Sequence, residues 1–256
     1  MKKYLLEVCV DSVESAEAAI KGGADRLELC GNLVIGGTTP GQALFEKVRE
    51  LGNIRIHVLI RPRYGDFLYT EDEFEIIARS VELSRRLGAD GVVTGCLLPD
   101  GSLDGERMKR LREQAGSMHM TLHRAFDMCR DPYETLEQAK KLGIQTILTS
   151  GQKADCLEGR ELIAGLVRQS GGKVDIMAGG GVDDGVIRQM IPDTAVTSYH
   201  MSGKITLDSG MLYRNPEVSM GAPAATGGIG EYQIFRTSRE KVRAAKAALE
   251  EAGKEI

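Results

Sequence analysis

The chain of 256 residues lacks tryptophan, is poor in aromatic residues (5%), and contains no long apolar run and no cluster of basic residues. Its apolar runs, such as Leu59-Ile60 and Val92-Val93, fall far short of the ~20 residues that cross a bilayer, so we expect no membrane span. Lysine and arginine number 33 against 37 acidic residues, a net charge of −4. Nucleic acid is therefore not expected as a partner, because neutralising phosphates needs a basic surface.

The five cysteines are an odd number and lie far apart in the sequence. The amino-terminal stretch does not read as an export signal, because Glu7 and Asp11 interrupt what would be its apolar region. In a chain that is not exported, scattered cysteines are better explained as reduced thiols than as a disulfide framework. We therefore expect a cytoplasmic protein.

Short β-rich runs alternate with helical stretches along most of the chain. The predicted strands cover 4–10, 25–30, 55–60, 91–95, 118–123, 146–150, 174–178 and 194–199. Gly23 and Gly88 each begin a Gly-Ala-Asp phrase, in which a helix-ending glycine is followed by a strand start. About eight β/α units in roughly 250 residues predict a (β/α)8 TIM-like barrel of the α/β class. We predict a single domain over 1–256, with the barrel over about 4–200 and an extension over about 203–256, made of an irregular segment and a final helix.

The rival arrangement is a doubly wound open sheet, which binds its ligand through a glycine fingerprint after the first strand. The segment at that place reads Val10-Asp11-Ser12-Val13 and contains no glycine. The sequence therefore favours the barrel.

Polar residues gather where the predicted strands end, which is where the active sites of TIM barrels lie. Glu7 and Glu28 belong to the first two strands, and a carboxylate inside a strand is costly unless it is paired. Arg61 follows the third strand and His123 ends the fifth. One explanation is a buried ion-pair network that joins the two glutamates to Arg61. The other is a catalytic pocket, in which a glutamate or His123 moves protons and Arg61 binds an anionic or hydroxylated ligand.

A glycine run follows the seventh strand, in a loop that often binds phosphate in this fold. Because glycine has no side chain, Gly179, Gly180 and Gly181 would let backbone N–H groups approach an anion, although a tight turn explains the run equally well. Further candidate ligand-binding residues lie at or just after the ends of the third, fifth, sixth and eighth strands: Arg63, Arg124, Asp127, Ser150, His200 and Ser202.

Cys9 and Cys30 lie in the first and second predicted strands. Adjacent strands are about 4.8 Å apart, so two thiolates at matching heights can share a soft metal ion such as Cu(I). The spacing is not a zinc pattern, and cysteines at such places are more often small packing residues. On the residues alone, the metal site and the packing role both stay open.

Several segments resemble those of the CutC family, and they extend from the first strand to about Asn215: LEVCVDS from Leu6, GADRLELC from Gly23, GGTTP from Gly36, IRPR from Ile60, GDFLY from Gly65, HRAFD from His123, LTSG from Leu148 and MAGGG from Met177. The resemblance implies a TIM-like barrel and a cytoplasmic protein associated with copper homeostasis. It also implies Cys9 and Cys30, in the EVC and ELC motifs, as copper ligands. His200-Met201-Ser202 resembles the family's H-x-S ending of strand eight, whereas Tyr64 stands where the family usually has glycine.

Two functions compete at this stage. The first is Cu(I) binding through the two strand-end cysteines, and the second is an enzyme (lyase, isomerase or hydrolase) that acts on a small polyol, sugar or sugar phosphate. Convergent sulfur atoms would favour the first, and a polar pocket over the strand ends would favour the second. The expected partner is a metal ion or a small molecule, and segment 203–235, rich in Gly, Ala and Met, is also compatible with packing on a second copy in a homo-oligomer.

Overall fold

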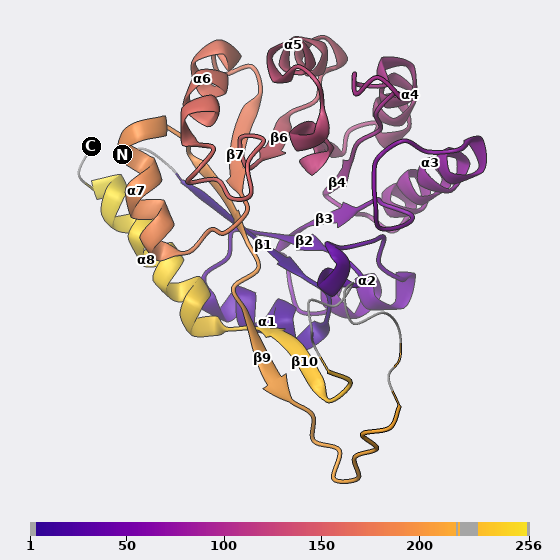
Figure 1. Cartoon of the computed structure of the whole chain (residues 1–256), viewed down its shortest axis with the longest axis vertical. Helices are drawn as coiled ribbons and strands as arrows, with labels where there is room; N and C mark the ends of the chain where they lie inside the picture. The colour runs from indigo at the N-terminus through magenta and orange to yellow at the C-terminus, as the bar shows by residue number, and fades with distance from the viewer. Residues whose placement is uncertain (1–3, 219, 221–229, 255–256) are drawn as a thin grey trace.

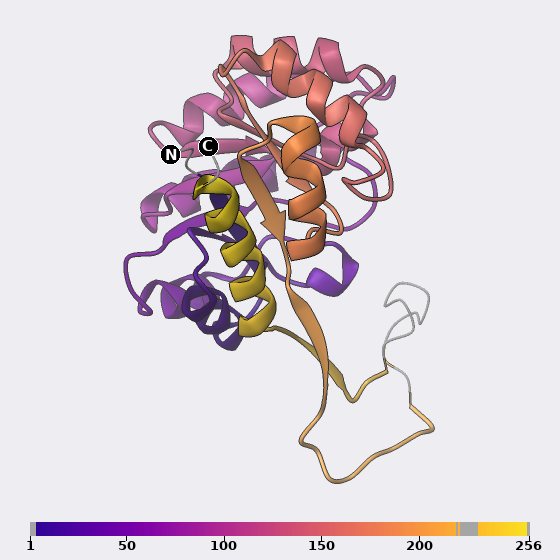
Figure 2. The same ribbon diagram turned by 90° about the vertical axis from the view of Figure 1, so that its left-hand side faces the viewer.

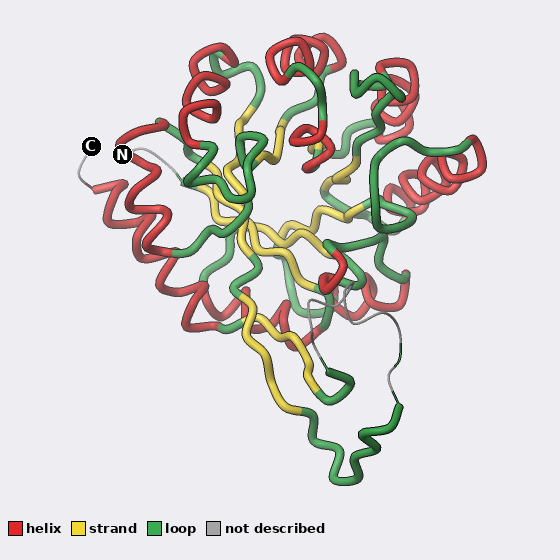
Figure 3. Tube along the Cα trace, in the orientation of Figure 1, coloured by secondary structure: helices red, strands yellow, loops and turns green. Residues whose placement is uncertain are grey.

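The computed structural model describes residues 4–218, 220 and 230–254, and its eight parallel strands form a closed barrel in sequence order. Helices surround the barrel (Figures 1 and 3). The strands are β1 (Leu5–Val10), β2 (Arg26–Leu29), β3 (Arg55–Leu59), β4 (Gly91–Thr94), β5 (His119–Leu122), β6 (Thr146–Thr149), β7 (Asp175–Gly179) and β8 (Ser198–Met201). The helices are α1 (Val13–Gly22), α2 (Gln42–Arg49), α3 (Glu71–Arg86), α4 (Gly105–Ala115), α5 (Pro132–Leu142), α6 (Arg160–Ser170), α7 (Asp184–Thr194) and α8 (Arg239–Lys254), with 3-10 turns η1 (Leu33–Ile35) and η2 (Arg124–Met128). The predicted (β/α)8 barrel is confirmed.

Local sequence signals set the ends of the helices. At the start of α3 the Thr70 hydroxyl accepts a hydrogen bond from the Glu73 N–H, and the Glu73 carboxylate accepts one from the Thr70 N–H. Asp131 caps α5, whose first residue is Pro132. Gly23 ends α1 with φ at 100°, a left-handed conformation that favours glycine. Among the described residues, none of these helices combines the length and the apolar character that a bilayer crossing requires.

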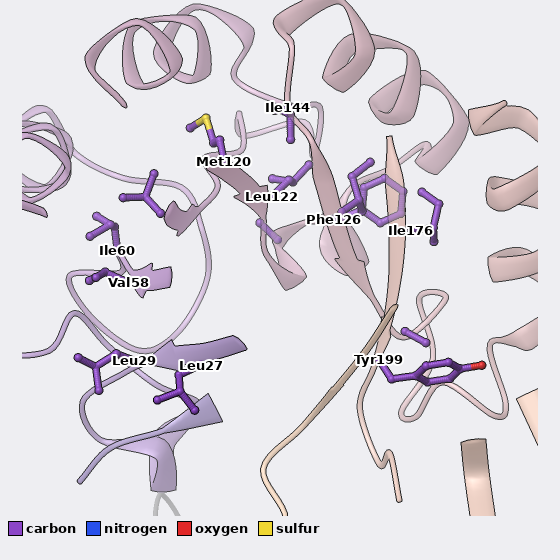
Figure 4. Close-up of a cluster of buried hydrophobic side chains, with 14 of the residues drawn as sticks. Leu27, Leu29, Val58, Ile60, Met120, Leu122, Phe126, Ile144, Ile176 and Tyr199 are labelled. Atoms are coloured by element: carbon purple, nitrogen blue, oxygen red, sulfur yellow. The ribbon is translucent and has the colours of Figure 1, made fainter. Parts of the chain in front are cut away.

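Each strand alternates between an apolar side that faces the helices and a side that faces the barrel interior. Leu27 and Leu29 of β2 are fully buried in the main hydrophobic cluster (Figure 4). The same cluster contains helix residues such as Phe74 of α3. The alternate residues of β2 are Arg26 and Glu28, both buried. The barrel interior is therefore polar at this strand, and its charges need partners there.

The chain beyond β8 forms a hairpin. β9 (Lys204–Asp208) and β10 (Gln233–Thr237) pair antiparallel and project away from the barrel (Figures 1 and 2). The predicted irregular segment therefore contains a strand at each end, because residues of high β propensity, Ile205 to Leu207 and Ile234-Phe235, face one another across the ladder. The final helix, α8, packs against α7 and α1 and closes the ring of helices. Residues 219 and 221–229 of the segment lie outside the described part of the chain.

The eighth strand begins later than predicted. α7 continues through Pro192 to Thr194, although proline is unusual inside a helix, and β8 starts only at Ser198. The predicted strand over 194–199 is therefore wrong at its start. His200 consequently lies inside β8, where it is paired in register with Glu7 of β1.

Candidate functional site

A pocket with a volume of about 290 Å³ opens at the carboxyl ends of the barrel strands. Its polar lining falls into two halves. The sulfur–acid half consists of Cys9, Glu28 and His200, which come from β1, β2 and β8. The cationic half is built by residues that follow β3 and β5 or begin β9: Arg61, His123, Arg124 and Lys204. The loop after β7 adds Gly180 and Gly181 to the lining.

The sulfur–acid half is assembled by three neighbouring strands, because β1 lies between β2 and β8 in the barrel. Cys9 is in register with Glu28 across the β1–β2 pair. One ligand atom from each of Cys9, Glu28 and His200 lies within 4.8 Å of the other two. A thiol, a carboxyl and an imidazole at such separations have the chemistry to hold a metal ion.

A buried ion pair supports this half from the barrel interior. The Glu7 carboxylate is fully buried, 2.5 Å from Nε of Arg26 and 2.8 Å from Nδ1 of His200. Burial by itself raises the pKa of Glu7, but Arg26 and His200 outweigh it, so the pKa is lowered and the carboxyl stays ionised. Glu7 does not line the pocket and instead positions His200.

His200 and Glu28 have pKa values shifted upward. Burial lowers the pKa of His200, but Cys9, Glu28 and the hydrogen bond to Glu7 raise it well above the ordinary 6.5. The ring is therefore charged near neutral pH and donates to Glu7 through Nδ1. Burial raises the pKa of Glu28, and the neighbouring Glu7 adds to this, while His200 opposes it.

Cys30 is fully buried beside this half, in a small apolar cluster with Cys9, Leu59 and Val93. Its Sγ donates to Oε2 of Glu28 at 3.3 Å. Burial and the nearby Glu28 raise the pKa of the Cys30 thiol well above its usual 9.0. Of the two predicted metal ligands, Cys9 is one of the three residues whose ligand atoms lie within 4.8 Å of one another. Cys30 is not among them, but its thiol contacts Glu28, which is.

Arg61 is held by backbone carbonyls. Its Nη1 donates to the oxygens of Gly36 and Gly37, and its Nη2 donates to the oxygen of Gly65 at 2.8 Å. The guanidinium also lies 5.1 Å from the centroid of the Phe67 ring. Of the two explanations offered by the sequence, the ion-pair network between Arg61 and the two glutamates is therefore wrong, because Arg26 and not Arg61 pairs with Glu7.

His123 is neutral and carries its proton on Nε2. Its Nδ1 accepts a hydrogen bond from the Ala125 N–H at 3.2 Å. Burial and the positive charge of Arg61 lower the pKa of His123 to about 3. A neutral imidazole that accepts at Nδ1 carries its proton on Nε2. In the described part of the chain, this Nε2 has no hydrogen-bond partner.

Arg124 is oriented by Asp127 and Ser150. Its Nε lies 2.7 Å from Oδ2 of Asp127, and its Nη2 donates to Oγ of Ser150 at 2.6 Å. Asp127 is itself fixed, because it accepts from the Thr149 hydroxyl and the Ser150 N–H. Neither Asp127 nor Ser150 lines the pocket, so both act on it through Arg124.

The structure brings nine of the fifteen predicted site residues to the pocket: Cys9, Glu28, Arg61, His123, Arg124, Gly180, Gly181, His200 and Ser202. The other six do not line it: Glu7, Cys30, Arg63, Asp127, Ser150 and Gly179. Arg63 points its Nε to Glu73 of α3, at 2.6 Å.

Two residues of the site, Arg26 and Lys204, were missed from the sequence. Arg26 stands two positions before Glu28 in the same strand, so strict alternation places both on one face of β2. Lys204 carries no comparable signal, because the start of the hairpin brings it to the pocket.

Comparisons with known proteins point to one family. A family model described as the CutC family matches residues 4–205. A protein from Bacteroides fragilis, named a family protein CutC, is 44% identical over 244 residues, which are 95% of this chain and 96% of that one. The copper homeostasis protein cutC homolog of Homo sapiens is 43% identical over 244 residues, which are 95% of this chain and 88% of the human protein. A solved structure from Streptococcus agalactiae, named as a CutC protein, has a TM-score of 0.74 at 28% identity and covers 78% of this chain and 98% of its own.

Proposed function

We propose, on the premise that the chain belongs to the CutC family, that it contributes to copper homeostasis by binding Cu(I) in the sulfur–acid half of the pocket. The observation that carries the proposal is the approach of ligand atoms from Cys9, Glu28 and His200 to within 4.8 Å of one another. These residues come from three separate strands, β1, β2 and β8, so the folded barrel is needed to assemble the site.

The donor set fits copper in two of its three groups. Thiolate sulfur and imidazole nitrogen suit copper, whereas a carboxylate is a harder ligand. We therefore assign Cys9 and His200 as ligands and Glu28 as a supporting acid beside them. Cys30 is the candidate for a second sulfur ligand, because its thiol contacts Glu28 directly.

Protons compete with the metal at this site. His200 is charged near neutral pH, and a metal ligand must be a neutral imidazole or a thiolate. Glu7 holds Nδ1 of His200, which leaves Nε2, 3.8 Å from the Glu28 carboxyl, as the nitrogen for the ion. Hydrogen bonding of the second ring nitrogen is the usual way to orient a histidine ligand. Copper binding is accordingly expected to release protons and to strengthen as the pH rises.

The proposed location is the cytoplasm. All five cysteines are free and buried thiols. Reduced thiols are what proteins keep in the cytosol, and thiolates select Cu(I).

The test is a Cu(I) titration of the reduced protein against a competing chelator. Cys9→Ser is expected to weaken binding at least as much as the ~10- to 100-fold caused by losing a partner of a metal ligand. Cys96→Ser is the matched control, because Cys96 is buried like Cys9 but lies in the main hydrophobic cluster and not in the pocket. An equal loss in Cys30→Ser would identify the second sulfur ligand. Wild-type affinity in Cys9→Ser would refute the proposal.

A further inference from the structure

The cationic half of the pocket contains buried donors that the protein leaves unused. His123 is 4% exposed, and its Nε2–H has no acceptor within the described residues. Arg61 is 9% exposed, and its Nε likewise has no partner there, although both Nη atoms are bound to carbonyls. A buried donor without an acceptor destabilises a fold, so such groups call for an explanation.

Charge around the pocket is suited to an anion. Among the described residues that line it, Arg61, Arg124 and Lys204 are cations, and Glu28 is the single carboxylic acid. Glu28 lies on the opposite half, beside the charged His200, at 3.8 Å. Arg124 pairs with Asp127, which lies outside the lining, whereas Arg61 and Lys204 form no ion pair with an acid among the described residues, so the cationic half keeps a net positive charge.

The loop after β7 leaves room for a ligand next to these cations. Gly180 and Gly181 line the pocket with φ at 93° and 77°, a left-handed conformation that favours glycine. A Cβ on Gly180 would stand 3.2 Å from Cβ of Ser150 and 3.7 Å from Cζ of Arg124. A side chain at this position would therefore press on Ser150, whose hydroxyl accepts a hydrogen bond from Arg124, and would contact the guanidinium itself.

From these observations we infer that the cationic half binds a small molecule that carries a phosphate group, with Arg124 and Lys204 contacting the phosphate and the Nε2–H of His123 donating to a ligand oxygen. The pocket volume of about 290 Å³ is at the lower end of the range for small-molecule sites, which suits a phosphate ester of a short polyol or a sugar. Phosphate oxygens accept several charge-assisted hydrogen bonds, so one such group satisfies both cations.

This inference stands apart from copper binding, since no member of the cationic half belongs to the metal-compatible group. The two are tested separately by working with copper-free protein in the presence of a chelator. Calorimetric titration with glycerol 3-phosphate and with inorganic phosphate is expected to show binding, and glycerol is expected to show none.

Arg124→Gln and Lys204→Gln are expected to weaken glycerol 3-phosphate binding about tenfold or more, since each removes a charged hydrogen bond. Both side chains reach solvent, so these variants are expected to fold. Arg130→Gln is the matched control, because Arg130 is a half-exposed arginine that pairs with Asp100 away from the pocket. His123→Leu is expected to weaken binding, and His123→Gln, which keeps an N–H donor, is expected to restore part of it.

Three outcomes would overturn the inference. The first is the absence of binding of both phosphates to the wild type. The second is wild-type affinity in both Arg124→Gln and Lys204→Gln. The third is tighter binding of glycerate than of glycerol 3-phosphate, which would show that the site prefers a carboxylate to a phosphate.

Discussion

Each half of the pocket contains a histidine, buried in the case of His123 and partly buried in the case of His200, and the two are in opposite charge states. His200 lies among Cys9, Glu28 and Glu7, which raise its pKa well above 6.5. His123 lies beside Arg61 in an apolar setting, which lowers its pKa to about 3. The charged His200 makes its half a place where a cation can replace a proton, and the neutral His123 makes its half a place where an N–H meets an anion or a carbonyl. Neighbours, and not residue type, therefore set the charge of each histidine.

The difference between the halves begins below the pocket. In the sulfur–acid half, Glu7 is neutralised from within the barrel by Arg26, at 2.5 Å. In the cationic half, the polar anchors of Arg61 are the backbone carbonyls of Gly36, Gly37 and Gly65. One half is thus supported by a buried ion pair and the other by loop backbone, and we expect substitutions to affect them differently.

Breaking the buried ion pair is expected to have the largest effect. Arg26→Leu removes the nearer partner of Glu7, at 2.5 Å, and leaves the buried carboxylate with His200 alone, which should lower the free energy of unfolding by about 3–5 kcal/mol. Urea denaturation measures this loss. Arg79→Leu, which removes an exposed pair with Glu75, should change the same quantity by less than about 1 kcal/mol. Equal effects of the two variants would show that the Glu7–Arg26 pair does not support the barrel.

Replacing the acid of the sulfur–acid half is expected to separate copper binding from stability. Burial raises the pKa of Glu28, so Glu28→Gln resembles its protonated form and should fold normally. We expect Cu(I) affinity to fall by about 10- to 100-fold, the range for groups that support a metal ligand. Chelator competition measures the affinity, and an unchanged value would remove Glu28 from the site.

The dependence of stability on pH sharpens the contrast between the histidines. Burial lowers the pKa values of His57, His119 and His123 to about 3, 4 and 3, against about 6.5 in an unfolded chain. Between the folded pKa values and about pH 6.5, the unfolded state therefore binds more protons than the folded state. The free energy of unfolding falls as the pH drops below about 6.5, by about 1.4 kcal/mol per pH unit for each such histidine. The contribution of His200 has the opposite sign: it is present below about 6.5 and is lost as the pH rises through its raised folded-state pKa.

Denaturation of the wild type and of His57→Asn at several pH values between about 7 and about 5 tests this account. The plot of unfolding free energy against pH should be less steep in the variant, by about 1.4 kcal/mol per pH unit, which is what one titrating histidine contributes. Equal slopes would mean that His57 is not held neutral by the fold.

The smallest effect is expected at Arg63. This arginine was a candidate ligand-binding residue, but its Nε pairs with Glu73 outside the pocket. Arg63→Gln should therefore leave the affinities for both Cu(I) and glycerol 3-phosphate within about twofold of the wild type. A loss comparable to that of Arg124→Gln would extend the cationic half to Arg63.

The sequence predicted the barrel and much of the pocket because both follow from local patterns. Cys9 and Glu28 belong to the first two predicted strands, and a TIM barrel gathers the carboxyl ends of its strands at one mouth, so both were expected at the site. The alternation of side chains along a strand does not indicate how close a residue lies to the mouth of the barrel. It therefore does not distinguish Cys9, which borders the pocket, from Cys30, which is enclosed beside it. The partner of Glu7 was also misassigned, because it depends on long-range contacts.

Two further differences between the prediction and the structure result from tertiary structure. The start of β8 was misplaced because α7 continues past Pro192, against the usual preference of proline. Lys204 reaches the pocket because the hairpin of β9 and β10 begins directly after β8, which nothing in the local sequence indicates.

The central claim is that one pocket holds two chemically separate sites. The most direct test measures both ligands, Cu(I) and glycerol 3-phosphate, on both Cys9→Ser and Arg124→Gln. The account predicts that Cys9→Ser loses copper and keeps the phosphate ester, while Arg124→Gln loses the phosphate ester and keeps copper. Loss of both ligands in either variant would contradict the account. Retention of both ligands in both variants would contradict it as well.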